Sequence, residues 1–344
     1  MKAQNHSLYI LFLLLMVGVT SNAQSKSIDK LGYMAKYYQS TNNFSRMFKT
    51  GNKFTVATRD ELIDALRKAK SGDVVYITDN AVINMSGVKY LSVNSGVTLA
   101  SGRISGLKKG ALLYSDSLVN NVFYINGDNV HITGITFRGP DTSRNEAQMQ
   151  ALASQKKFYA VPTSDCIECK FNNLEVDNCE LYGWTHAAIY LRLGARNAKI
   201  HNNYIHHNQR QGLGYGIALD SATAVIYNNV FEWNNHSVTG TGRKGTSFVA
   251  YQNIVLNSLP DSPVFDMHGG KDRKDGTDIA GDSVVLYSNV IYSTSKIFGV
   301  RGTPVYRYKI YNNTFINGKV NYQSVRSLNE HRFIDTYGNK AIKN

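Results

Sequence analysis

Imidazole, carboxylate, phenol and guanidinium side chains recur at matched positions in five short segments of the second half of the chain. The segments read AAIYLRL from Ala187, YGIALDS from Tyr215, HSVTGTG from His236, VFDMHGG from Val264 and IFGVRG from Ile297. Side chains of these types can transfer protons and stabilise developing charge, which is what general acid–base catalysis needs. These segments are therefore where the sequence places a candidate active site.

Alternation along a strand decides which of these side chains point outward. With Ile189 and Leu191 pointing inward, stacking of the segments predicts one outward wall. Its members are Arg192, Asp220, Thr241, His268 and Arg301, with Tyr190 and Asp266 beside them and Tyr215 and His236 one step earlier. The wall depends on register, because a slip of one residue would turn a strand inside out.

The spacing around His268 suggests a catalytic base. His268 follows Asp266 by two positions and precedes a Gly-Gly pair, so a carboxylate can orient its imidazole while the glycines leave room for a polymer. The candidate catalytic residues are His268 and His236 as the base, Tyr215 as the proton donor and Arg301 as the group that neutralises charge.

The rest of the wall supplies candidate substrate contacts, namely Arg192, Tyr190, Asp220, Thr241 and Asp266. Two more, Lys271 and Arg273, lie in GGKDRKDGTDIAGD, the longest insertion between segments, and long loops on rigid repeats often line binding sites. The acid spacing of this insertion is not that of an EF-hand. Calcium, held by Asp220 and Asp266, is the one candidate ion, and no other cofactor is expected.

A repeated phrase must position these segments. AKIHNNYI begins at Ala198, and it recurs as AVIYNNVF, FVAYQNIV, VVLYSNVI and YKIYNNTF after steps of 26, 24, 36 and 24 residues. Weaker copies begin at Val130 and Leu174, and a further echo spans 337–342. A period of this size indicates a solenoid.

Short phrases rich in Val, Ile, Tyr and Phe that alternate apolar with polar residues indicate strands. About 24 residues suffice for three strands and three turns, so we predict an all-β fold, a single-stranded right-handed parallel β-helix. Equivalent residues should then stack. The expected asparagine ladder is Asn203, Asn229, Asn253, Asn289 and Asn313, and His201 should stack with the column of Tyr227, Tyr251, Tyr287 and Tyr311.

The N-terminal part carries a capping signal. Thr58 and Glu61 form a capping box that opens a helix ending near Lys70, and an amphipathic helix here would cover the exposed edge of the first coil. The segment FTVATRDELIDALRKAKSGDVVYITDN resembles the N-terminal segment of pectin-lyase-like β-helix enzymes, in particular the chondroitinase-B/alginate-lyase type. We expect a single domain over 25–344, with a cap at about 54–72, coils at about 73–317 and a C-terminal cap at 318–344.

Residues 1–24 have the pattern of a signal peptide, with Lys2, an apolar run over 8–19 and a small-residue site at 21–23. The run is short for a membrane span, so we expect an exported protein, periplasmic or extracellular, without stable membrane insertion. The formal charge of +13 falls to +12 without Lys2 and favours polyanionic partners. We expect an acidic polysaccharide, no nucleic acid because no recognition motif is present, and a monomer.

Three cysteines, Cys166, Cys169 and Cys179, lie within fourteen positions. Export permits one disulfide and one odd thiol, with the pairing left open. Cys179 occupies the slot in which later coils have Asn, so a buried ladder position is the alternative. A CxxC without a second pair is weak evidence for zinc.

The resemblance implies a polysaccharide-active enzyme, and its family motifs are incomplete. The GHG motif with paired Asp residues expected of polygalacturonases is absent, and the Arg-x-Pro-x-x-Arg run of pectate lyases appears only distorted from Arg301 to Arg307. The Lys and Arg catalytic pair of chondroitinase-B-like enzymes has no assigned counterpart. We expect a lyase that cleaves a uronic-acid polymer by β-elimination. The alternatives are a glycoside hydrolase using Asp220 and Asp266, a uronate epimerase, and a carbohydrate-binding or adhesive β-helix.

Overall fold

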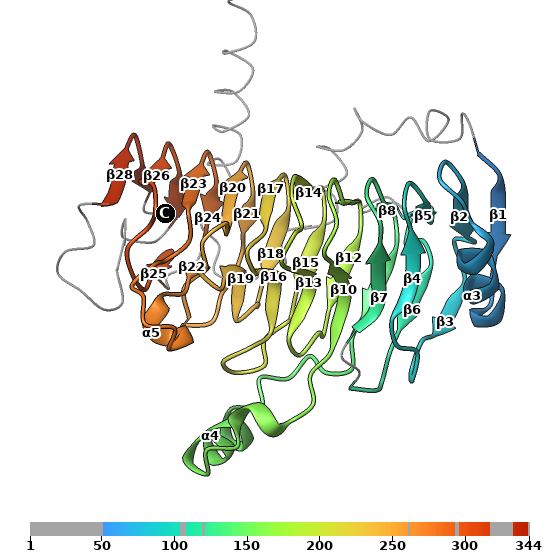
Figure 1. Cartoon of the computed structure of the whole chain (residues 1–344), viewed down its shortest axis with the longest axis horizontal. Helices are drawn as coiled ribbons and strands as arrows, with labels where there is room; N and C mark the ends of the chain where they lie inside the picture. Colours follow the sequence, from blue (N-terminus) through green and yellow to red (C-terminus); the bar gives the residue numbers. More distant parts are fainter. Residues whose placement is uncertain are drawn as a thin grey trace, which may run out of the picture.

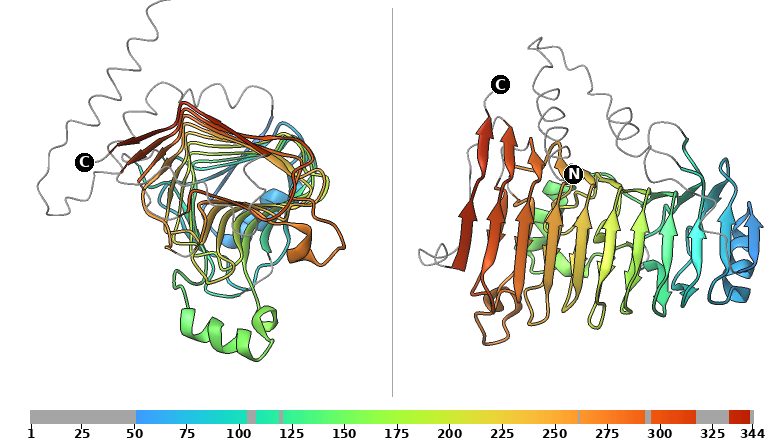
Figure 2. Two further views of the ribbon diagram at one scale, coloured as in Figure 1. Left: turned by 90° about the vertical axis from the view of Figure 1, so that its left-hand side faces the viewer. Right: turned by 90° about the horizontal axis from the view of Figure 1, so that it is seen from above.

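The strands of the protein wind into a right-handed parallel β-helix, as the repeat predicted (Figure 1). The computed structural model describes residues 51–103, 108–118, 121–260, 262–292, 296–316 and 333–342. The predicted signal peptide and most of the segment predicted as a C-terminal cap lie outside these ranges. Every pairing between the described strands is parallel, and successive coils stack along the axis of the solenoid (Figure 2).

Three sheets form the faces, and all bounds refer to the described residues. Sheet A contains, in spatial order, β1 (Lys53–Val56), β2 (Val74–Ile77), β5 (Thr98–Ala100), β8 (His131–Thr133), β11 (Glu175–Asp177), β14 (Ala198–His201), β17 (Thr223–Tyr227), β20 (Ser247–Tyr251), β23 (Ser283–Tyr287), β26 (Tyr308–Tyr311) and β28 (Ile334–Tyr337). Sheet B contains β3 (Val82–Asn84), β6 (Leu112–Tyr114), β9 (Thr136–Arg138), β12 (Glu180–Tyr182), β15 (Tyr204–His206), β18 (Val230–Glu232), β21 (Ile254–Val255), β24 (Val290–Ile291), β27 (Thr314–Ile316) and β29 (Lys340–Ile342). Sheet C contains β4 (Leu91–Asn94), β7 (Asn121–Asn126), β10 (Asp165–Cys169), β13 (Ala187–Leu191), β16 (Tyr215–Leu219), β19 (His236–Gly240), β22 (Phe265–Met267) and β25 (Phe298–Val300).

The N-terminal cap is the helix α3 (Arg59–Lys68). The backbone N–H of Glu61 donates to Thr58 Oγ1 at 3.3 Å, and the Glu61 carboxylate accepts from the Thr58 N–H at 3.1 Å, so the predicted capping box is present. The helix buries Leu62 and Leu66 against the first coil. Strand β1 precedes the helix and pairs with β2, so strand pairing begins about twenty residues before the predicted start at 73.

The asparagine ladder is continuous and extends beyond the five predicted members to Asn339, in the echo at 337–342. Each Nδ2 donates to the Oδ1 of the next Asn at 2.9–3.0 Å, from Asn203 through Asn313 to Asn339. At the other end, the N–H of Cys179 donates to Asn203 Oδ1 at 3.0 Å. Because Asn339 belongs to the ladder, and β28 and β29 pair with β26 and β27, the segment predicted as a C-terminal cap contributes a further coil.

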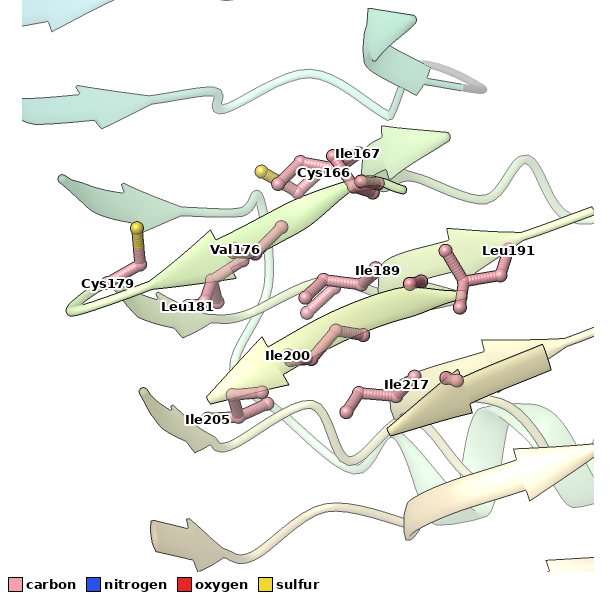
Figure 3. Close-up of a cluster of buried hydrophobic side chains, with 14 of the residues drawn as sticks. Cys166, Ile167, Val176, Cys179, Leu181, Ile189, Leu191, Ile200, Ile205 and Ile217 are labelled. Carbon is pink, nitrogen blue, oxygen red and sulfur yellow. The ribbon is translucent and has the colours of Figure 1, made fainter. Parts of the chain in front are cut away.

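Aliphatic side chains from successive coils stack in the interior of the solenoid (Figure 3). Ile167, Ile189 and Ile217 align on sheet C, and Val176 and Ile200 align on sheet A. Cys166, Cys169 and Cys179 are buried in the same core, and none forms a disulfide. The interior is therefore apolar, and the sheets present their chemistry outward.

Two insertions leave the solenoid on either side of sheet C. Helix α4 (Glu146–Ser154) and the 3-10 helix η2 (Phe158–Ala160) lie in the connection that leads into β10. Helix α5 (Gly270–Arg273) lies in the connection that leaves β22. Because all strands run parallel, the connection with α4 lies at the N-terminal ends of the strands of sheet C and the connection with α5 at their C-terminal ends. The green α4 and the orange α5 project in different directions in Figure 2. In the described ranges, no helix is long and apolar enough to cross a membrane.

Candidate active site

The predicted register of the outward wall on sheet C is confirmed by strand pairing. From one coil to the next, Tyr190 pairs with Ala218, Ala218 pairs with Thr239, and Thr239 pairs with Asp266. Tyr215 pairs with His236 one step earlier. A second column consists of the residues that directly follow the strands of sheet C. The backbone N–H of each donates to a backbone carbonyl of the preceding coil, and the members are Arg192, Asp220, Thr241, His268 and Arg301. The predicted face and order of the wall are therefore confirmed.

Asp266 is the centre of the C-terminal half of this wall, and its side chain is 0% exposed. Its Oδ2 lies 2.8 Å from Arg301 Nη2 and 2.9 Å from His268 Nε2. Arg301 Nε donates to the other carboxylate oxygen at 3.2 Å. His236 Nε2 lies 3.7 Å from Oδ2. One buried carboxylate thus holds two imidazoles and a guanidinium together.

Burial and these neighbours act in opposite directions on Asp266. Burial alone would raise the pKa of its carboxyl, but His236, His268 and Arg301 together hold that pKa well below its ordinary value. Asp266 is therefore a carboxylate at neutral pH. Burial lowers the pKa of His236 to about 4 despite the attraction of Asp266. Its Nδ1 donates to the carbonyl of Pro263 at 2.6 Å, so His236 is a neutral and rigidly held imidazole.

His268 is the accessible imidazole of the cluster, with 26% of its side chain exposed. Its Nε2 lies 2.9 Å from Asp266 Oδ2 as an ion-pair contact, but neither of these two atoms makes a hydrogen bond within the described part of the chain. The contact places a buried carboxylate beside a partly exposed imidazole, which favours uptake of a proton by the ring. This arrangement gives His268 the geometry of a general base.

Tyr215 stacks on His236, with ring centroids 5.5 Å apart and an interplanar angle of 17°. Its hydroxyl donates to the carbonyl of Gly212 at 3.0 Å. Burial, followed by the charge of Asp266, raises the pKa of Tyr215, so the phenol keeps its proton. As a proton donor, Tyr215 would have to exchange the Gly212 carbonyl for a substrate oxygen.

The N-terminal half of the wall contains a pair that the sequence prediction missed. His186 Nδ1 lies 2.6 Å from Asp165 Oδ1, and the His186 ring meets both Tyr190 and Tyr215 edge-on. The pairing of Asp165 with Ala187 places it on the outer face, where it reaches the histidine that precedes β13. The only sequence signal was that His186 directly precedes AAIYLRL.

Arg192 and Tyr190 lie together beside this pair. Arg192 Nη1 donates to Glu168 Oε1 at 3.0 Å, and its guanidinium lies 5.4 Å from the centre of the Tyr190 ring. Burial raises the pKa of Tyr190 to about 12. The wall therefore has a second position with a partly exposed cation and an aromatic ring, on the coil of β13, two coils before the coil of Thr241.

Asp220 is engaged by other side chains. It accepts from Thr241 Oγ1 at 2.8 Å and from Arg243 Nη1 at 2.8 Å through both carboxylate oxygens. Asp266 is likewise surrounded by Arg301 and two imidazoles. Calcium prefers oxygen ligands, often several carboxylates, that are free of competing cations. These two carboxylates therefore do not fit the calcium site that the sequence suggested.

The insertion after β22 is held in place by Arg273. Its Nη1 donates to the Thr241 carbonyl at 2.7 Å, and its Nη2 donates to the Ile279 carbonyl at 2.9 Å. Arg273 thus joins the insertion to the backbone at Thr241. Lys271, in contrast, is exposed on α5 at the edge of the wall.

The insertion before β10 covers the other edge of the wall. Phe158 packs against Leu213 and Tyr215, and Arg210 Nη1 donates to the Pro162 carbonyl at 2.9 Å. The neighbouring Tyr159 is 82% exposed. The outer face of sheet C thus lies between two projecting segments.

The fold is similar to that of known polysaccharide-active enzymes. The alginate lyase from Paenibacillus sp. str. FPU-7 aligns with a TM-score of 0.59 and 16% identity, over 84% of this chain and 95% of that chain. The family 28 exopolygalacturonase of Yersinia enterocolitica aligns with a TM-score of 0.58 and 11% identity, over 86% of this chain and 66% of that chain. No family model matches the sequence, and no curated protein matches it. At these identities the likeness shows the fold alone, a parallel β-helix.

Proposed function

We propose that this protein is a polysaccharide lyase that cleaves a uronic-acid-containing polymer by β-elimination. The observation that carries the proposal is the geometry of His268. Its partly exposed imidazole lies with Nε2 2.9 Å from the buried carboxylate of Asp266, and Nδ1 is the nitrogen that would accept a proton. Arg301 directly follows the adjacent strand β25.

The reaction follows from these groups. Nδ1 of His268 takes the proton from the carbon next to the uronate carboxylate. Arg301 offsets the negative charge that then builds on that carboxylate. The electron pair forms a carbon–carbon double bond as the bond to the glycosidic oxygen breaks. Tyr215, which burial keeps protonated, supplies a proton to that oxygen.

The two carboxylates do not support a hydrolase. Hydrolysis needs one carboxyl that is protonated near neutral pH and a second carboxylate as base or nucleophile. The pKa of Asp266 is held below its ordinary value by its cationic neighbours, although burial opposes this, and Asp220 is paired with Arg243. A lyase and a hydrolase both have this fold, so the fold does not distinguish the two activities. The absence of a carboxyl group suited to act as an acid, among the two candidates, is why we prefer the lyase.

The proposal includes export and an acidic substrate. The apolar run at 8–19 supports export to the periplasm or the extracellular medium, and the positive net charge supports a polyanionic substrate. The outer face of sheet C, with Arg192 and Tyr190 at one end and His268 at the other, would hold several sugars of the polymer.

A single screen separates the proposed activity from its alternatives. Purified protein is incubated with uronic-acid polymers while the ultraviolet absorbance of unsaturated uronate and the number of reducing ends are followed. A lyase raises both signals together. New reducing ends without absorbance would show a hydrolase, altered uronate stereochemistry without cleavage an epimerase, and binding without any product a carbohydrate-binding protein. Each of these three outcomes would overturn the proposal.

Replacement of His268 tests the assignment of the base. We expect His268→Ala to lose at least ~100-fold in turnover, a typical general-base contribution. Its melting temperature should change little because the side chain lies on the outer face. The matched control is His206→Gln on sheet B, where Nε2 also faces a carboxylate, Glu180, at 3.2 Å. Near-normal turnover of folded His268→Ala, or an equal loss in the control, would contradict the assignment.

A further inference from the structure

A second cluster of histidines and carboxylates lies on the outer face of sheet A, on a different face from the candidate active site. His131 comes from β8, Glu175 and Asp177 come from β11, and His201 comes from β14. The register places Glu175 beside His131, and Asp177 beside His201. Three consecutive coils therefore bring four potential metal ligands to one spot.

The donor atoms of this cluster are close together. His131 Nε2 lies 3.1 Å from Asp177 Oδ1, and His201 Nε2 lies 2.9 Å from Glu175 Oε1 and 4.0 Å from Asp177 Oδ2. One donor atom each from His131, Glu175 and Asp177 lie within 4.8 Å of one another. Ligand atoms on a tetrahedral zinc ion with bonds of ~2.1 Å lie roughly 3.4 Å apart. Three of the side chains therefore need only small movements to bind one ion, and His201, which contacts both carboxylates but lies outside this group of three, must move further to join them as a fourth ligand.

The charge of the cluster distinguishes it from the similar group on sheet C. With neutral imidazoles, Glu175 and Asp177 contribute two negative charges, and only 12% of the Asp177 side chain is exposed. Within the described ranges, no Lys or Arg forms an ion pair with either carboxylate. On sheet C, by contrast, Arg301 lies 2.8 Å from Asp266. A divalent cation would balance the sheet A cluster, whereas the sheet C cluster contains its own cation.

We propose that His131, Glu175, Asp177 and His201 form a binding site for one divalent transition-metal ion, with zinc as the expected ion. Two imidazoles and two carboxylates are a ligand set that suits zinc, and four side chains fill a tetrahedral site without an open position. A closed site of this kind is structural. The ion would join β8, β11 and β14.

The site also marks the start of the stacked rings on sheet A. The His201 ring stacks on Tyr227 at 4.5 Å and 14°, and the column continues through Tyr251 and Tyr287 to Tyr311 and Tyr337. A metal on His201 would therefore fix the first ring of the stack. We expect the ion to increase thermal stability without touching the chemistry on sheet C.

The test uses full-length protein without an affinity tag, treated with EDTA and desalted. Titration with ZnCl₂ in a calorimeter should show one equivalent bound. Zinc at a hundredfold excess over its dissociation constant should raise the melting temperature by roughly 5 °C. Asp177→Asn and His201→Gln should weaken binding by more than the ~10–100-fold that loss of an outer-shell partner costs. His268→Gln is the matched control and should bind zinc as the unaltered protein does.

Three results would overturn the proposal. They are the absence of stoichiometric binding by the unaltered protein, retained binding in folded Asp177→Asn, and loss of binding in His268→Gln. Cobalt(II) provides a readout that does not depend on variants that fold. The intense visible bands of a four-coordinate ion in the unaltered protein would support the site, and the weak spectrum of hydrated cobalt would contradict it.

Discussion

Replacement of Asp266 by Asn is the sharpest test of how the site on sheet C is built. The substitution keeps the size of the side chain and removes the charge that Arg301 and His268 contact at 2.8 and 2.9 Å. Removal of one partner from a buried ion pair typically costs ~3–5 kcal/mol because the other charge is left uncompensated. The side chains of Arg301 and His268 are 19% and 26% exposed, so water can solvate them in part. We therefore expect a loss of ~3 kcal/mol in the free energy of unfolding.

The same change should reduce catalysis separately. Without the carboxylate, His268 loses the negative charge 2.9 Å from its ring, and we expect turnover to fall by at least ~100-fold. Urea denaturation at neutral pH measures the first effect, and the unsaturated-uronate assay measures the second. The control for stability is Asp220→Asn, whose partner Arg243 is mostly exposed, so its loss should cost at most ~1 kcal/mol.

A double variant tests the physical reason. Asp266→Asn combined with Arg301→Met removes the uncompensated cation, so it should regain part of the lost stability while turnover stays low. Asp266→Asn with the stability and turnover of the unaltered protein would refute the view that this carboxylate organises the site. A double variant less stable than the single one would refute the charge argument.

The remaining predictions concern the ladder and the pH dependence of stability. Asn253 is buried and its side chain makes four hydrogen bonds at 3.0 Å. At ~1 kcal/mol for each bond, Asn253→Ala should lower the free energy of unfolding, measured by urea denaturation, by ~4 kcal/mol, and Asn339→Ala, at a partly exposed position, by about half as much. Equal losses in the two variants would contradict the ladder argument. Burial lowers the pKa of His236 to about 4, so between pH 6.5 and 4 the unfolded chain binds a proton that the folded site does not. The contribution of His236 to the free energy of unfolding is therefore complete above pH 6.5 and is lost as the pH falls toward 4. In His236→Gln, the free energy of unfolding should fall less steeply over that range, and a slope equal to that of the unaltered protein would contradict this prediction.

The fold could be predicted from the sequence because the repeat encodes it locally. Each coil carries its own apolar residues and its own Asn, so the position of Asn203 in one copy predicts that of Asn229 in the next. Parallel stacking then aligns equivalent residues, which is why the wall on sheet C was predicted in the correct order. The last coil, with Asn339, was seen only as an echo because its phrase is incomplete.

Contacts between side chains of different coils were decided by the tertiary structure. Asp165 and His186 are 21 residues apart, and His131 and Asp177 are 46 apart, because connections of different length separate the strands. A repeat gives the column of a residue but does not say which rotamer reaches a neighbour, so these pairs were missed. Burial acts in the same way. His236 and His268 are both outward on one face, yet only the packing of Pro263 and Tyr215 around His236 makes it a buried, neutral imidazole. The sequence by itself therefore determined the solenoid and the face on which the chemistry lies. The tertiary structure alone decided which groups are paired, buried or free to react, because those properties depend on distances across coils that no local pattern records.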